Sequence, residues 1–191
     1  MMLSTLKRGV KSFLSDLDVS KITLGQVPII SYHQLDELPN EYNAIEDLFI
    51  LPDGRKSKAV IILYENTYNT GHYCALIKTP SHHLEFFDPY GSKHKGIGGV
   101  DEELKFSNYN KKNNHIFLKN LVSNSRYKNH FYTNPYDFQM DKSGVNTCGR
   151  WSGARCRLSH LPLEVFHKLF LVDPIMPPDL MITAMTLLDT I

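Results

Sequence analysis

The sequence lacks long hydrophobic runs. No segment approaches the roughly 18 consecutive apolar residues that a membrane span requires. Near the N-terminus, Lys7, Arg8 and Lys11 interrupt any apolar run, which argues against a signal peptide. N-x-S/T sequons are also absent, so nothing indicates secretion. We therefore expect a protein without a membrane partner.

The sequence also has few cysteines and almost no excess of either charge. Lys and Arg number 21 against 20 Asp and Glu, so no overall basic field forces a nucleic-acid partner. The three cysteines are an odd number without C-x-x-C spacing, which argues against a disulfide framework and a zinc knuckle. With 191 residues, of which 42% are hydrophobic, the chain is long enough to bury a core of its own.

Apolar residues near the N-terminus recur at helical spacing. A helix over about residues 3–17 would place the following residues on one face: Leu6, Val10, Phe13, Leu14 and Leu17. We expect this helix to dock on the body of the protein.

The fold class predicted for the remainder is α+β, with a central, mostly antiparallel sheet flanked by helices. β-Branched and apolar runs of strand length predict neighbouring strands at 58–64, 72–78 and 84–88. Weaker signals predict a hairpin strand at 48–51, a strand at 137–140, and helices at 116–122 and from 147 onward. The domain organisation predicted is one domain over residues 1–191, with its core at about 28–160 and C-terminal helices at about 163–191.

Cys148 differs from the other two cysteines in its local sequence. It lies in a turn-rich stretch, residues 144–151, that opens a predicted helix. A thiol in the first turn of a helix faces unpaired backbone N–H groups and the positive end of the helix dipole, which both lower its pKa. Cys148 is therefore a candidate nucleophile. Cys74, in a predicted strand, and Cys156, within the predicted helix, are expected to be packing residues.

A thiolate nucleophile needs a base, and His72 at the start of a predicted strand is the candidate. Asp88 ends the next strand, and the separation of 16 residues fits two antiparallel strands whose ends lie side by side. Asp88 would then hold the imidazole tautomer and stabilise the imidazolium. Glu85 is a competing acid that points differently along the strand. Gln139 and the backbone N–H of Cys148 are candidate oxyanion donors, of a kind worth roughly 3 to 4 kcal/mol.

These four residues follow one another in an order that a known family shares: His72, Asp88, Gln139, Cys148. Together with the stretches Gly-His-Tyr, Phe-Asp-Pro-Tyr-Gly and Asn-Thr-Cys-Gly, this order resembles the adenovirus-type maturation proteases and their relatives, the SUMO-deconjugating cysteine proteases. The resemblance covers about residues 70–160. The short chain is most similar to the capsid-maturation proteases of virophages and related DNA viruses. The resemblance implies a papain-like cysteine protease architecture of the adenain type.

The same resemblance implies a viral cysteine endopeptidase that cleaves capsid or other structural proteins during virion maturation. Its location would be the virion and the host-cell site of virus assembly. No cofactor is expected to be required, while activation by a peptide or by DNA stays open. Weak DNA binding could use a local basic patch made of Lys93, His94, Lys95, Lys111 and Lys112, but at a net charge of +1 we expect these residues to form a solvated loop.

Other interpretations stay open. The same site could remove ubiquitin-like modifiers or transfer an acyl group. A non-catalytic capsid-associated binding protein could keep the fold, although it would not need His72, Asp88 and Cys148 together. Zinc binding by Cys148, Cys156 and His160 lacks a fourth ligand at the usual spacing, so we expect no metal.

Overall fold

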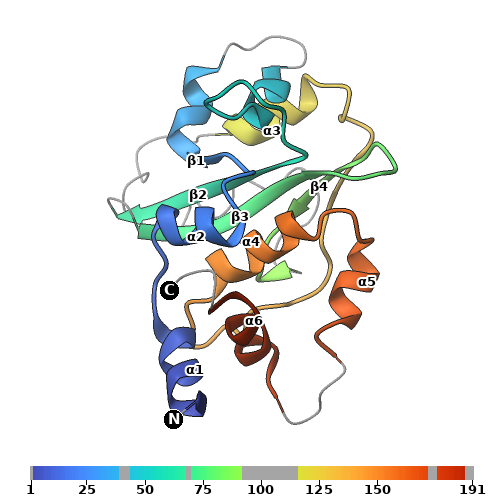
Figure 1. Ribbon diagram of the computed structural model, residues 1–191. Helices are drawn as coiled ribbons and strands as arrows, with labels where there is room; N and C mark the ends of the chain where they lie inside the picture. The colour runs from blue at the N-terminus through green and yellow to red at the C-terminus, as the bar shows by residue number, and fades with distance from the viewer. Residues whose placement is uncertain (1, 39–43, 68–69, 92–115, 172–175, 188–191) are drawn as a thin grey trace.

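The computed structural model describes residues 2–38, 44–67, 70–91, 116–171 and 176–187. In this part of the chain a five-stranded sheet, in the order β1-β2-β3-β4-β5, lies between two layers of helices (Figure 1). The strands are β1 (Ile29–Ser31), β2 (Ala59–Thr67), β3 (Thr70–Lys78), β4 (Leu84–Phe87) and β5 (Phe131–Thr133). The predicted central sheet flanked by helices is thus observed.

The three strands predicted from β-branched and apolar runs form the centre of the sheet. β2 pairs with β3 and β3 pairs with β4, both antiparallel as expected. The edge strands differ from the prediction, because β1 and β5 each run parallel to their neighbour, so the sheet is mixed. Each edge strand is only three residues long, which is too short for a periodic pattern to reveal.

Two weaker strand predictions are wrong. Residues 48–51 do not form a hairpin strand, since Leu48 and Phe49 belong to the 3-10 helix η2 (Ala44–Phe49), and only Ile50 bridges to Lys56. Residues 137–140 form a loop in place of a strand. The backbone N–H groups of Phe138 and Gln139 both donate to the carbonyl of Pro89, so this loop is held beside the end of β4.

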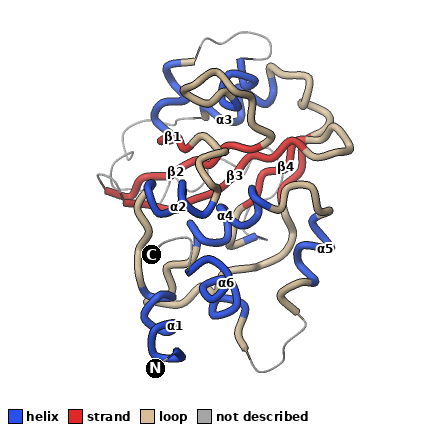
Figure 2. The backbone as a smooth tube through the Cα atoms, in the orientation of Figure 1, coloured by secondary structure: helices blue, strands red, loops and turns tan. Residues whose placement is uncertain are grey.

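The two faces of the sheet are covered by different helices (Figures 1 and 2). One face carries η1 (Tyr32–Glu37), η2 and α3 (Phe117–Ser123). The other carries α2 (Asp16–Ile22), α4 (Cys148–Arg157), α5 (Leu163–Lys168) and α6 (Pro178–Leu187). No helix in the described ranges is long and apolar enough to cross a membrane.

A hydrophobic core lies on each face of the sheet, and side chains from alternate positions of the central strands contribute to one core or the other. Val60 and Ile62 of β2 face the layer of η1, η2 and α3, whereas Ile61 and Leu63 face α4, and all four are buried. Because β2 is covered on both faces, it is apolar at successive positions and does not alternate between apolar and polar residues. Helix α4 packs directly on β3, which places its first residue, Cys148, near one end of the sheet.

The N-terminal helix predicted over residues 3–17 is two helices, α1 (Met2–Lys11) and α2. Ser15 begins α2 with a capping box, in which its hydroxyl accepts from the N–H of Asp18 and the Asp18 carboxylate accepts from the N–H of Ser15. Consequently Phe13 and Leu17, expected on the docking face, are exposed, while Leu6 is buried. The docking itself is observed, because α1 packs beside α6 (Figure 1).

Candidate active site

His72 and Asp88 meet across neighbouring strands. Asp88 follows β4 directly, and the pairing of Ala75 with Phe87 brings Asp88 level with Cys74. Since side chains two apart on a strand share a face, His72 and Cys74 point to the same side of the sheet. His72 Nε2 lies 2.7 Å from Asp88 Oδ1, and both side chains are buried. The structure therefore brings the predicted base and acid into contact.

Asp88 and the imidazole are held by residues that sequence reasoning missed. The N–H of Asp88 donates to Asn134 Oδ1 at 2.7 Å, and Asn134 Nδ2 donates back to the Asp88 carbonyl at 2.8 Å. The backbone N–H of Tyr90 donates to Asp88 Oδ1 at 2.8 Å. The Tyr90 ring stacks on the His72 imidazole, with centroids 4.8 Å apart. The Asp88 carboxylate at the ring edge and the Tyr90 ring on its face thus fix the orientation of the imidazole.

Cys148 is the first residue of α4, as predicted, and is partly buried. The hydroxyl of Ser152 donates to the carbonyl of Tyr73 at 2.8 Å, which ties the helix to β3 beside His72. A Cβ at Gly149 would lie 2.9 Å from a Val19 methyl group and 3.2 Å from the Tyr73 ring. Glycine at this position therefore lets the start of α4 approach both α2 and β3 closely.

The electrostatics of the site favour a thiolate and an imidazolium. Burial raises the pKa of the Cys148 thiol, but the hydrogen bond and charge of His72, with backbone hydrogen bonds at Tyr73 and Gly149, hold that pKa below its ordinary value. Burial lowers the pKa of His72, but Cys74, the Asp88 carboxylate and the hydrogen bonds to Asp88 and Cys148 hold it well above its ordinary value. The two shifts stabilise the ion pair that a nucleophilic thiol requires.

Gln139, the fourth predicted residue, is buried in the same cluster. Its Nε2 donates to Tyr90 Oη and to the Val145 carbonyl, each at 3.1 Å. Among the described residues, none donates a hydrogen bond to its Oε1. Both amide hydrogens are therefore engaged, and donation to an oxyanion would replace one of these two bonds.

The competing acid Glu85 has a structural partner. Arg155 donates to both of its carboxylate oxygens, at 2.8 and 2.9 Å, and Tyr132 Oη donates at 2.8 Å. Both members of the ion pair are buried. Glu85 therefore neutralises a buried guanidinium, and Asp88 is the acid that contacts His72.

The other two cysteines occupy different surroundings. Cys74 is buried next to the His72–Asp88 pair, and these three side chains offer donor atoms within 4.8 Å of one another, close enough to hold a metal ion. The sequence did contain a signal for Cys74 as a neighbour of His72, because residues two apart on a strand point to the same side of the sheet. Burial raises the pKa of the Cys156 thiol, which keeps it protonated. Cys148 and Cys156 are eight residues apart on one helix, about 12 Å, so they cannot share a zinc ion.

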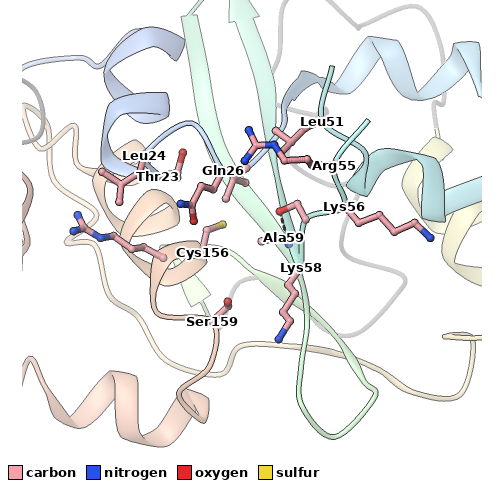
Figure 3. Close-up of a pocket in the computed structure, with 13 residues that line it drawn as sticks. Thr23, Leu24, Gln26, Leu51, Arg55, Lys56, Lys58, Ala59, Cys156 and Ser159 are labelled. Carbon is pink, nitrogen blue, oxygen red and sulfur yellow. Dashed lines mark hydrogen bonds between the residues drawn. The ribbon is translucent and has the colours of Figure 1, made fainter. Parts of the chain in front are cut away.

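Cavities lie at both ends of α4. One, of about 360 Å³, adjoins the candidate site and is lined by Tyr90, Gln139, Met140 and Asp179 among others. Another, of about 310 Å³, lies at the C-terminal end of the helix, where Cys156 and Ser159 face Arg55 and Lys58 (Figure 3). None of the four predicted site residues lines the second cavity, which is therefore remote from the thiol. The predicted basic patch of Lys93, His94, Lys95, Lys111 and Lys112 lies outside the described residues.

Comparison with known proteins places the chain among virophage proteins. No family model matches the sequence. Uncharacterized protein V9 of Sputnik virophage is 30% identical over 189 residues, an alignment that covers 95% of this chain and 98% of that protein. Identity at this level over nearly the whole of both chains indicates common descent. The chain therefore belongs to the family of virophage proteins that includes uncharacterized protein V9.

Proposed function

We propose that the chain is a viral cysteine endopeptidase of the adenain type, with a papain-like architecture, that cleaves capsid or other structural proteins during virion maturation. The observation that carries the proposal is the contact of His72 Nε2 with Asp88 Oδ1, which leaves Nδ1 for the thiol at the start of α4. The opposite pKa shifts of Cys148 and His72 support it. Membership of a virophage family supports the choice of a virophage capsid protein as the proposed substrate.

The proposed reaction is acyl transfer through Cys148. Its thiolate attacks the scissile carbonyl, and the oxyanion receives hydrogen bonds from the Gln139 side chain and the Cys148 N–H. His72 then gives its proton to the leaving amine, which leaves a thioester. Water, deprotonated by His72, hydrolyses the thioester and restores the thiol. Asp88 keeps the imidazole oriented and stabilises its charged form throughout.

Substrate, location and activation follow from the same proposal. The enzyme would work in the virion and at the site of virus assembly, where its thiols stay reduced. By the resemblance to viral maturation proteases, peptides with small residues, often Gly, around the cut would be preferred. No cofactor would be required, and peptide or DNA would act only as an activator.

The test compares wild-type protein with Cys148→Ala on purified capsid protein of the same virophage, in reducing buffer, with and without added DNA. The matched control is Cys156→Ala, which makes the same chemical change at the other end of α4. We expect cleavage by wild type and by Cys156→Ala, and none by Cys148→Ala. Equal cleavage by all three proteins, or no cleavage in any buffer, would contradict the proposal. Faster release of an isopeptide-linked ubiquitin-like modifier would favour deconjugation.

A further inference from the structure

A buried carboxylate in the last helix connects two segments of the candidate site. Asp179 lies in the first turn of α6 and is only 5% exposed. Its Oδ1 accepts from the Trp151 indole N–H at 3.0 Å and from the Thr147 hydroxyl. Its Oδ2 accepts from the backbone N–H of Met140 at 3.0 Å. Three donors from two separate segments therefore converge on one carboxylate.

The two segments are those that carry the proposed nucleophile and oxyanion donor. Thr147 immediately precedes Cys148, and Met140 immediately follows Gln139. Because the two carboxylate oxygens are a fixed distance apart, Asp179 sets the separation between these segments. Hydrogen bonds to an ionised acceptor are shorter and about twice as strong as neutral ones, so this link is stiff.

Asp179 is itself held in place by α6. The Thr183 hydroxyl donates to the Asp179 carbonyl at 2.7 Å, which secures the first turn of the helix. Arg150 Nη1 donates to Thr186 Oγ1 at 2.9 Å, which fastens α6 to α4. The carboxylate is thus a fixed element of the tertiary structure.

We infer that Asp179 is a positioning residue, which holds Gln139 and Cys148 in the arrangement that forms the oxyanion site. This inference rests on the proposed function. A misplacement of about 1 Å at a reacting centre can cost about a hundredfold in rate. Helix α6 contributes no reacting group. Catalysis would still require this helix, because it carries the carboxylate that positions the two segments.

Two conservative variants break the link at different points. In Asp179→Asn, the amide oxygen can still accept from Thr147 and Trp151, but the amide nitrogen cannot accept from the N–H of Met140. In Thr147→Val, the shape is kept and the hydroxyl is removed. Asp137→Asn is the matched control, because it makes the same chemical change at an exposed carboxylate lining the same cavity.

The experiment measures amide hydrogen exchange of the full chain, together with kcat and KM on a capsid-derived peptide. In Asp179→Asn we expect the Met140 amide to exchange at least tenfold faster, while the amides of β2 and β3 are unchanged. We expect kcat to fall at least tenfold in both Asp179→Asn and Thr147→Val, with KM within twofold of wild type. The alkylation pH profile of Cys148 should not move, since His72 and Asp88 are untouched.

Different results would overturn the inference and the proposed function. Unchanged exchange at Met140, exchange that accelerates equally over β2 and β3, or kcat within twofold of the Asp137→Asn control would each overturn the positioning role. If wild type cleaves no peptide while the Met140 amide of Asp179→Asn exchanges faster, the proposed function fails and the link through Asp179 stands.

Discussion

His72 presents Nε2 to Asp88 Oδ1 at 2.7 Å, so Nδ1 is the ring nitrogen that remains for Cys148. The order along the site is acid, imidazole and thiol, with the acid directly after β4, the imidazole on β3 and the thiol at the start of α4. The stacked ring of Tyr90 and the hydrogen bonds of Asn134 keep this order in place.

The thiol of Cys148 should react as a thiolate at pH values below the ordinary thiol pKa of about 8.5. Its pKa is lowered and that of His72 is raised, and both shifts favour the thiolate–imidazolium pair. The rate of iodoacetamide alkylation should fall only as pH drops through the lowered thiol pKa. In His72→Ala the profile should move to higher pH, because the hydrogen bond and the charge are lost. Superimposable profiles, with the modified residue identified by mass spectrometry, would refute the ion pair.

Removal of the Asp88 charge should impair catalysis more than binding. In Asp88→Asn an amide oxygen can still meet His72, but the imidazolium loses the carboxylate that stabilises it. We expect kcat to fall by about a hundredfold or more with little change in KM. Asp53→Asn, at an exposed carboxylate paired with Arg55, is the control and should retain wild-type kcat. A kcat for Asp88→Asn within threefold of wild type would rule out this role.

The contact between His72 and Asp88 predicts that the stability of the folded protein depends on pH. The pKa of His72 in the folded protein lies well above its ordinary value of about 6.5. Its contribution to stability is therefore complete below about pH 6.5 and is lost as pH rises through the raised pKa. The melting temperature of wild type should exceed that of Asp88→Asn most near pH 6, and the difference should shrink toward alkaline pH. A difference that grows with pH would show that the shift has the opposite sign.

Gln139 should contribute to the transition state. Loss of one oxyanion donor costs about 10² to 10³ in kcat in comparable enzymes, and we expect Gln139→Ala to fall in this range with KM unchanged. Tyr90→Phe removes an acceptor for Nε2 but leaves the Val145 carbonyl, so its effect should be smaller. Gln26→Ala, at an exposed residue of the remote cavity, is the control. An equal loss of kcat in the control would point to a non-specific cause.

Glu85 should matter for stability and not for chemistry. Glu85→Ala leaves the buried guanidinium of Arg155 unpaired, which costs about 3 to 5 kcal/mol in unfolding free energy. Chemical denaturation would measure this loss, and the pH dependence of Cys148 alkylation should stay that of wild type wherever the variant is folded. Unaltered stability with an altered alkylation profile would instead make Glu85 part of the site.

The elements that sequence patterns predicted are those whose signals are local. The runs at β2, β3 and β4 are long enough to show β-branched and apolar character, and the turn before Cys148 marks the start of α4. The break between α1 and α2 was missed because Ser15 and Asp18 form a capping box inside a stretch whose apolar spacing continues through it. The edge strands β1 and β5 were missed because each has only three residues, too few for a periodic pattern of apolar residues to be recognised.

Residue types and their order along the chain were enough to identify the candidate nucleophile, base, acid and amide. The residues that hold them became visible only in the folded protein: Tyr90 on the imidazole, Arg155 against Glu85, and Asp179 between the two segments of the site. Asp179 is 32 residues from Thr147 and 39 from Met140, and such contacts leave no periodic trace. They form only when α6 packs against α4 and a buried carboxylate must find its donors.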